Sequence, residues 1–210
     1  MAWISDNWPL IVSKTMEHLV ISLLSLGIGV LIAGPLGILI NRNEKVSKFL
    51  LSVASVLQTL PSLALLAIMV PFFGVGKLPA IIALVIYSLL PILRNTILGM
   101  RSVDKTLIDA SYGMGLNYYQ ILREVQIPLA MPIIISGISL SAIYVVAWAT
   151  IASYIGAGGL GDIIFMGLSN YNFGAVFGGS IPVTLLALFF DWSIGRLEKR
   201  LTPKMSREGR

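Results

Sequence analysis

Cysteine is absent from this sequence of 210 residues, and His18 is its single histidine. These two absences exclude disulfide bonds, thiolate metal sites and clusters of histidines around a metal. They also exclude catalysis by a cysteine or by a histidine triad within one chain. We therefore expect no catalytic residue and no metal site in this chain.

Charged side chains are scarce as well. They make up 12% of the residues, against 56% hydrophobic residues, and the mean hydropathy is +0.87. A soluble domain of this size needs far more charge on its surface. A net charge of +5 would suggest nucleic acid binding in a soluble protein, but basic loops on one side of a membrane explain it better. We predict an all-α integral membrane protein that contacts membrane lipid and does not bind nucleic acid.

Charge-free runs mark the expected spans, because a bilayer core requires about 20 apolar residues per helix. The first run lacks a basic segment before it and is too long for a signal peptide, so we expect a permanent span. A charge at a helix centre costs about 2.5–3.5 kcal/mol, which predicts that Arg94 lies near a membrane surface. We predict one transmembrane domain, residues 1–210, with five spans at about 19–40, 49–73, 78–99, 129–152 and 173–194.

Basic residues gather on one side of these spans. Thirteen of the fifteen Lys and Arg residues lie in the loop at 41–48, around residues 94–123 and in the tail from 196 onward. Only Lys14 and Lys77 lie on the other side. Because basic loops remain in the cytoplasm, we predict an external amino terminus, a cytoplasmic carboxy terminus and a cytoplasmic loop at 104–128.

That loop is the longest polar, helix-forming stretch between the apolar runs. Two short amphipathic helices fit it, separated at Gly115. Asn117 and Gln120 have the spacing of a capping box, which would open the second helix. Pro128 and Pro132 are then expected to end that helix before the next span.

The spacing in this loop resembles the "EAA" loop of bacterial ABC-importer permeases. The family pattern is Glu-Ala-Ala, three residues, Gly, nine residues, Ile-x-Leu-Pro, and every gap has the same length here. The departures are Asp for Glu, Ser for Ala, Val for Ile and Ile for Leu. The alternative is an amphipathic loop on the membrane surface. By resemblance, the residues that couple to the ATPase are Asp109, Ala110, Ser111, Gly115, Val125, Ile127 and Pro128.

Three further segments narrow the resemblance. QTLPSLALL at 58–66, PFFGVGKLPAI at 71–81 and YSLLPILRNT at 87–96 are similar to the permease of osmoprotectant importers, which take up glycine betaine, carnitine or choline. The resemblance implies the type I importer permease fold in a bacterial plasma membrane. It also implies an ATPase dimer that binds ATP and Mg, a second permease subunit (identical or paralogous) and an extracellular solute-binding protein. This chain would itself hold no cofactor.

Two other functions stay open at this point. The first is an amino-acid importer permease of the methionine type, which shares the size and the loop. The second is a secondary carrier or channel, which would require ionisable residues within the spans for ion coupling. An enzyme within the membrane is disfavoured because paired carboxylates are missing from the spans.

Two groups of residues are hypotheses for a solute pathway. Pro61 is expected to kink the second span and free carbonyl groups beside polar side chains, and a kink that serves packing alone is the alternative. Tyr144 and Trp148 could offer aromatic faces to a quaternary ammonium group, and core packing is the alternative. The pathway hypothesis names Gln58, Thr59, Pro61, Ser62, Tyr144 and Trp148.

The run IGAGGLGD at 155–162 matches the dinucleotide pattern G-x-G-x-x-G, but a membrane helix stands where that site requires a strand. The run instead resembles the segment between the last two spans of importer permeases, near the external gate. We expect a flexible turn there. The hypothetical gate residues are Gly156, Gly158, Gly159 and Gly161.

Overall fold

The computed structural model describes residues 2–201, and these form helices without a strand. Of the expected cytoplasmic tail, Lys204, Arg207 and Arg210 lie outside the described residues. The helices are α1 (Ala2–Asp6), α2 (Trp8–Ile40), α3 (Glu44–Thr59), α4 (Ser62–Phe73), α5 (Lys77–Ser102), α6 (Lys105–Gly113), α7 (Tyr118–Gln120), the π-helix η1 (Ile121–Gln126), α8 (Ile127–Ala152), the 3-10 helix η2 (Ser153–Ile155), α9 (Leu160–Ser169) and α10 (Phe173–Leu201).

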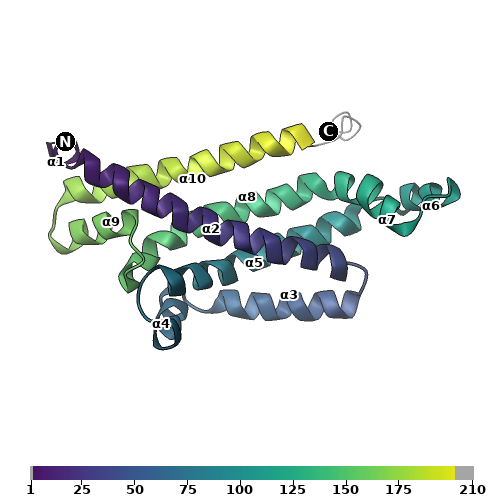
Figure 1. Ribbon diagram of the computed structural model, residues 1–210, viewed down its shortest axis with the longest axis horizontal. Helices are drawn as coiled ribbons and strands as arrows, with labels where there is room; N and C mark the ends of the chain where they lie inside the picture. Colours follow the sequence, from purple (N-terminus) through teal and green to yellow (C-terminus); the bar gives the residue numbers. More distant parts are fainter. Residues whose placement is uncertain (1, 202–210) are drawn as a thin grey trace.

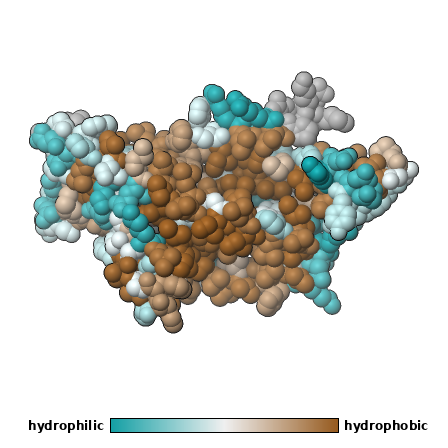
Figure 2. All heavy atoms as spheres, viewed as in Figure 1, coloured by the Kyte–Doolittle hydropathy of each residue, from teal (hydrophilic) through white to brown (hydrophobic). Residues whose placement is uncertain are grey.

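Four segments of the described chain are long and apolar enough to cross a membrane: α2, α5, residues 118–155 and α10. The pair α3 and α4 adds a fifth if it counts as one broken span. The long helices run roughly side by side in Figure 1. Figure 2 shows an apolar band across the middle of the molecule and polar residues at both ends. This confirms the predicted all-α membrane fold with about five spans.

The expected second span is broken, where a kink was predicted. Helices α3 and α4 meet at an angle of 95°. Leu60 has the extended backbone angles φ −63° and ψ 132°, because a residue that precedes proline is disfavoured in the α region. Pro61 then stands at the N-cap of α4. The break therefore separates two helices and turns α4 across the end of the bundle (Figure 1).

The expected end of the second loop helix at Pro128 and Pro132 is wrong. Residues 118–155 form one continuous helical segment. Pro128 lies in the first turn of α8, where a missing N–H is tolerated. The π-helical residues of η1 precede it and widen the helix at this point. The second helix of the loop therefore leads directly into a candidate membrane span.

Small residues let α5 lie at the centre of the bundle. A Cβ built on Gly29 would lie 2.0 Å from Ser88 Oγ, and one on Gly37 would lie 2.7 Å from Thr96. On another side of α5, a Cβ on Gly137 would lie 2.4 Å from the Asn95 Cβ. Gly29 and Gly37 of α2 therefore allow this helix to pack closely against α5. This central position places α5 between α2 and α8.

Candidate functional site

The loop at 104–128, which we call the coupling loop, projects from one end of the bundle as α6 and α7 (Figure 1). Helix α6 begins at its N-cap Asp104, whose carboxylate accepts a hydrogen bond of 2.8 Å from the Thr106 backbone N–H. This hydrogen bond holds the pKa of Asp104 below its usual value. The cap keeps the start of α6 in place at the end of α5.

Gly115 separates the two helices of the coupling loop, as predicted. Its φ is +86°, in the left-handed region that a side chain disfavours. The predicted capping box is also present: Gln120 donates its backbone N–H to Asn117 Oδ1 at 3.0 Å, and Asn117 donates its own to Gln120 Oε1 at 2.8 Å. Both helices of the loop therefore have defined ends.

The residues of the loop motif lie in two environments. Asp109 and Ala110 are exposed on α6, whereas Ser111 is buried and donates its hydroxyl to the Leu107 carbonyl at 2.7 Å. Val125, Ile127 and Pro128 are half-buried where η1 meets α8. The exposed residues form the solvent-facing surface of the loop, and the half-buried residues connect that surface to α8.

Two large apolar side chains are prominent at the tip of the loop. Met114 is 72% exposed and Tyr119 is 77% exposed. Met114 belongs to a helical stripe of residues 107, 110, 111 and 114 that the sequence shows, whereas no sequence pattern marked Tyr119. Behind the tip, Arg42 stacks on the Tyr118 ring, with 4.0 Å from Cζ to the ring centre, and so ties the loop after α2 to α7.

An aromatic cluster of Tyr87, Tyr144 and Trp148 lies beside the break between α3 and α4. Trp148 has ring centres 4.4 Å from Tyr87 and 5.2 Å from Tyr144. The Tyr87 hydroxyl donates to the Leu60 carbonyl at 2.8 Å, and Gln58 Nε2 donates to the Tyr87 carbonyl at 3.3 Å. Two predicted groups of pathway residues, which are far apart in sequence, therefore meet here.

The remaining pathway residues take no direct part in this cluster. Thr59 is exposed and donates its hydroxyl to the Val56 carbonyl within α3 at 2.6 Å. Pro61 is exposed, and Ser62 is half-buried at the start of α4. Tyr87 is the residue that sequence reasoning missed, because no local pattern shows that it joins the end of α3 to α8.

The glycine run at 156–161 is tied down by its neighbours, where a flexible turn was expected. Gly156, Gly158 and Gly159 have φ of +76°, +83° and +82°. A Cβ on Gly161 would lie 2.1 Å from the Thr150 carbonyl oxygen, so this glycine allows α9 to pack on the end of α8. The Ile155 carbonyl accepts the Gly76 N–H at 2.7 Å. The run connects α8 to α9 at the end of the bundle opposite the coupling loop (Figure 1).

Four charged residues form an ionic cluster, the ionic clasp, beside this run: Lys14, Glu17, Lys77 and Asp162. Glu17 pairs with Lys77 at 2.6 Å and with Lys14 at 3.0 Å, and Lys14 pairs with Asp162 at 2.5 Å. The Gly159 N–H also donates to Glu17 at 2.9 Å. The clasp joins α2, the start of α5 and α9, and it was not foreseen because its members are far apart in sequence.

We expect Glu17→Gln to lower the Tm of the purified chain by about 2–4 °C, because a part-buried ionic network contributes about 1 kcal/mol. The matched control is Glu44→Gln, which removes an exposed i,i+4 pair with Lys48 within one helix and should leave the Tm unchanged. Thermal unfolding in detergent at low and high salt measures both. An equal Tm for the two variants would show that the clasp does not stabilise the fold.

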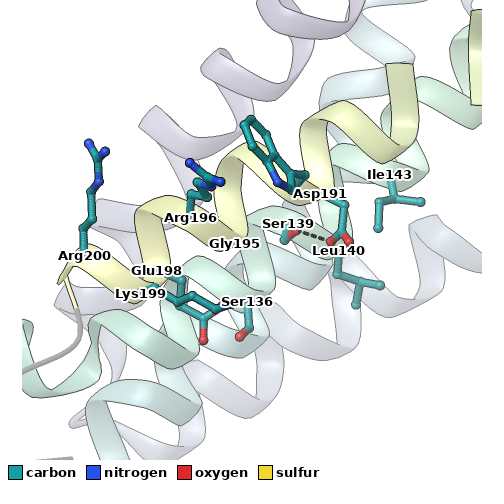
Figure 3. A pocket seen from close by; sticks show the side chains of 11 residues that line it. Ser136, Ser139, Leu140, Ile143, Asp191, Gly195, Arg196, Glu198, Lys199 and Arg200 are labelled. Atoms are coloured by element: carbon teal, nitrogen blue, oxygen red, sulfur yellow. Dashed lines mark hydrogen bonds between the residues drawn. The ribbon is translucent and has the colours of Figure 1, made fainter. Parts of the chain in front are cut away.

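A groove of about 750 Å³ lies between α8 and α10 (Figure 3). Ser139 donates its hydroxyl to Asp191 at 2.9 Å, and these two side chains point toward each other in the figure. Arg196 stacks on Trp192, with 4.3 Å from Cζ to the ring centre. Asp191 and Arg196 are thus already engaged within the chain.

Comparison with known proteins gives matches over nearly the whole chain. A family model described as "Binding-protein-dependent transport system inner membrane component" matches residues 14–203. A carnitine transport permease protein (OpuCB) of Listeria monocytogenes is 54% identical, over 100% of this chain and 96% of the relative. A glycine betaine/carnitine/choline transport system permease protein (OpuCB) of Bacillus subtilis is 46% identical, over 97% of this chain and 94% of the relative.

A choline transport system permease protein (OpuBB) of Bacillus subtilis is also 46% identical, over 96% of this chain and 93% of the relative. Among solved structures, a chain of the inward-facing MetNI methionine ABC transporter superposes with a TM-score of 0.85. It covers 94% of this chain and 99% of its own length, at 24% identity. This structural likeness shows a shared fold.

Proposed function

Since this chain belongs to the family of binding-protein-dependent transport system inner membrane components, we propose that it is the membrane subunit of an ATP-driven importer for a quaternary ammonium osmolyte. Glycine betaine, carnitine and choline are the solutes in the names of relatives that are 46–54% identical over nearly the full length. This identity is the observation that carries the proposal. The chain is a transport permease in a cell membrane, and the choice of solute is the proposed step.

The coupling loop is the proposed contact with the ATPase. Its tip exposes Asp109, Met114 and Tyr119, while Ser111 and Val125 are packed within the chain. Exposed apolar residues of this kind favour a protein interface. The ATP and Mg would bind in the ATPase dimer, and this chain would supply no catalytic residue. The other residues proposed for coupling are Ala110, Gly115, Ile127 and Pro128.

A second permease subunit, identical or paralogous, completes the proposed pathway. Five spans are few to enclose a solute, so two subunits related by a two-fold axis would surround it. Closure of the ATPase dimer would draw the two coupling loops together. In each subunit, α7 continues through η1 into α8. This movement would therefore tilt the span that carries Trp148 and change the side from which the pathway is open.

An extracellular solute-binding protein would deliver the solute to the end opposite the coupling loop. In this proposal the amino terminus lies outside a bacterial cell and the carboxy terminus inside. The glycines of the run at 156–161 and the ionic clasp would close that outer end. Most of the affinity would belong to the binding protein, because tight binding midway would slow release.

The two alternative functions have less support. A methionine importer is favoured only by the likeness to MetNI, which at 24% identity concerns the fold. A secondary carrier or channel leaves the projecting coupling loop without a purpose. We therefore carry one function into the experiment.

The test is ATP-dependent uptake by the reconstituted complex. The chain is co-purified with its ATPase, its second permease and its binding protein, and uptake of glycine betaine, carnitine, choline and methionine into proteoliposomes is measured. We expect uptake of at least one quaternary ammonium solute and none of methionine. Uptake of methionine alone would contradict the proposed solute class, and uptake without ATP would contradict the proposed mechanism.

A further inference from the structure

Arg94 is a charged residue in the middle part of a membrane helix. It lies 17 residues after Lys77 and 8 residues before Ser102, the two ends of α5. At a rise of about 1.5 Å per residue, this places it about 26 Å from the outer end and about 12 Å from the inner end. Helix α5 thus continues for about two turns beyond the position that we expected at a membrane surface.

The side chain of Arg94 is exposed, and it has neither a hydrogen bond nor an ion pair with any residue in the 2–201 range. Its neighbour Asn95 donates its amide to the Pro91 carbonyl at 2.9 Å and packs against Gly137 of α8. An unpaired charge that faces lipid is strongly unfavourable. Such residues face a water-filled cavity or a partner group instead.

The aromatic cluster lies on the side of Arg94 toward which its side chain is expected to tilt. Arg94 and Tyr87 are seven residues apart, so they lie on the same side of the helix, about 10 Å apart along its axis. A helical side chain tilts toward the helix N-terminus, which is the direction from Arg94 to Tyr87. Tyr87 contacts Trp148. The length of the arginine side chain brings its guanidinium group closer to this cluster than the distance along the helix axis suggests.

The same tilt disfavours contact with lipid phosphates. In the proposed orientation α5 runs from outside to inside, so the tilt directs Arg94 away from the nearer, cytoplasmic surface. A side chain that reaches for headgroups would have to point the other way. The charged groups of the α8–α10 groove differ from Arg94, because Asp191 and Arg196 have partners within the chain.

We propose that Arg94 binds the carboxylate of the solute while the quaternary ammonium group rests on Tyr144 and Trp148, the two less buried members of the aromatic cluster, so that the pathway favours zwitterions over choline. This inference rests on the proposed function. A guanidinium group matches a carboxylate with two parallel hydrogen bonds, and aromatic faces attract a quaternary ammonium group. Glycine betaine and carnitine carry both groups. Choline lacks the carboxylate, and the fixed positive charge repels it.

The experiment compares Arg94→Gln with Arg94→Lys in the reconstituted complex. Uptake of carnitine, glycine betaine and choline is measured for each variant relative to the wild-type complex, together with assembly by size-exclusion chromatography. We expect Arg94→Gln to reduce carnitine and glycine betaine uptake roughly tenfold, the effect of one charge-assisted contact. Arg94→Lys keeps the charge and should retain at least a third of the wild-type rate. Choline uptake should be unchanged or higher in Arg94→Gln.

Three results would overturn the inference. The first is carnitine uptake in Arg94→Gln that equals the wild-type value. The second is an equal loss in Arg94→Lys and Arg94→Gln, which would indicate a packing role. The third is a loss of choline uptake as large as that of carnitine. Where the wild-type complex carries no choline, the comparison of the two variants decides. A wild-type complex that imports no quaternary ammonium solute would contradict the proposed function itself, whatever the variants do.

Discussion

Replacement of Gly115 by valine should reduce ATP-dependent uptake about tenfold while the complex still assembles. Gly115 has a φ of +86°, and a left-handed backbone costs an L-residue about 1–2 kcal/mol. A β-branched side chain would therefore favour another backbone conformation and change the angle between α6 and α7. Because a factor of ten corresponds to about 1.4 kcal/mol, most coupling loops would then present the wrong surface to the ATPase.

Gly113→Val is the matched control, since it lies two residues away at the end of α6. A Cβ on either glycine meets nothing within 4 Å, and only Gly115 has a positive φ. Uptake and ATP hydrolysis are measured together in proteoliposomes. We expect Gly115→Val to lose more uptake than hydrolysis and Gly113→Val to resemble the wild type. Equal activity in the two variants would mean that the conformation of this hinge does not matter for coupling.

The second large effect should come from Trp148→Leu, which we expect to reduce uptake of quaternary ammonium solutes by up to about thirtyfold. A cation–π contact in a desolvated site contributes up to about 2 kcal/mol. Leucine keeps a large apolar side chain next to Tyr87 and Tyr144 but removes the aromatic face. Initial uptake rates at saturating binding protein measure the change.

Trp148→Phe is the control for this experiment, because it also reduces the side-chain volume but keeps an aromatic face. It should retain most of the uptake, and both variants should unfold at similar temperatures. If both variants lose uptake to the same extent, Trp148 serves core packing, the alternative that the sequence left open. The ratio of the two uptake rates therefore decides between pathway and packing.

Local features of the coupling loop were predictable because their physics is local. The capping box of Asn117 and Gln120 depends on residues three apart, and the left-handed turn at Gly115 depends on the one residue without a Cβ. The effect of the prolines was not predictable in the same way. A proline breaks a helix when it stands in the helix interior. The π-helical residues of η1 come directly before α8, so that Pro128 stands in the first turn of α8.

Contacts between distant segments could not be found from the sequence. Glu17 and Gly159 are joined by a hydrogen bond across 142 residues, and Tyr87 brings Leu60 and Trp148 together. No periodicity or motif carries information about which helices face each other at such positions. The same limit applies to Arg94, whose distance from the end of α5 depends on where that helix ends.

The sequence by itself determined that this chain is a membrane-embedded helical protein with a two-helix loop. Apolar runs of about 20 residues satisfy their backbone hydrogen bonds only as helices in lipid, and this rule needs no tertiary information. Only the tertiary structure decided that Tyr87, Tyr144 and Trp148 form one cluster and that Glu17 holds the glycine run. Both arrangements depend on how closely the helices approach, and that distance is set where Gly29 and Gly37 of α2 and Gly137 of α8 lie against α5.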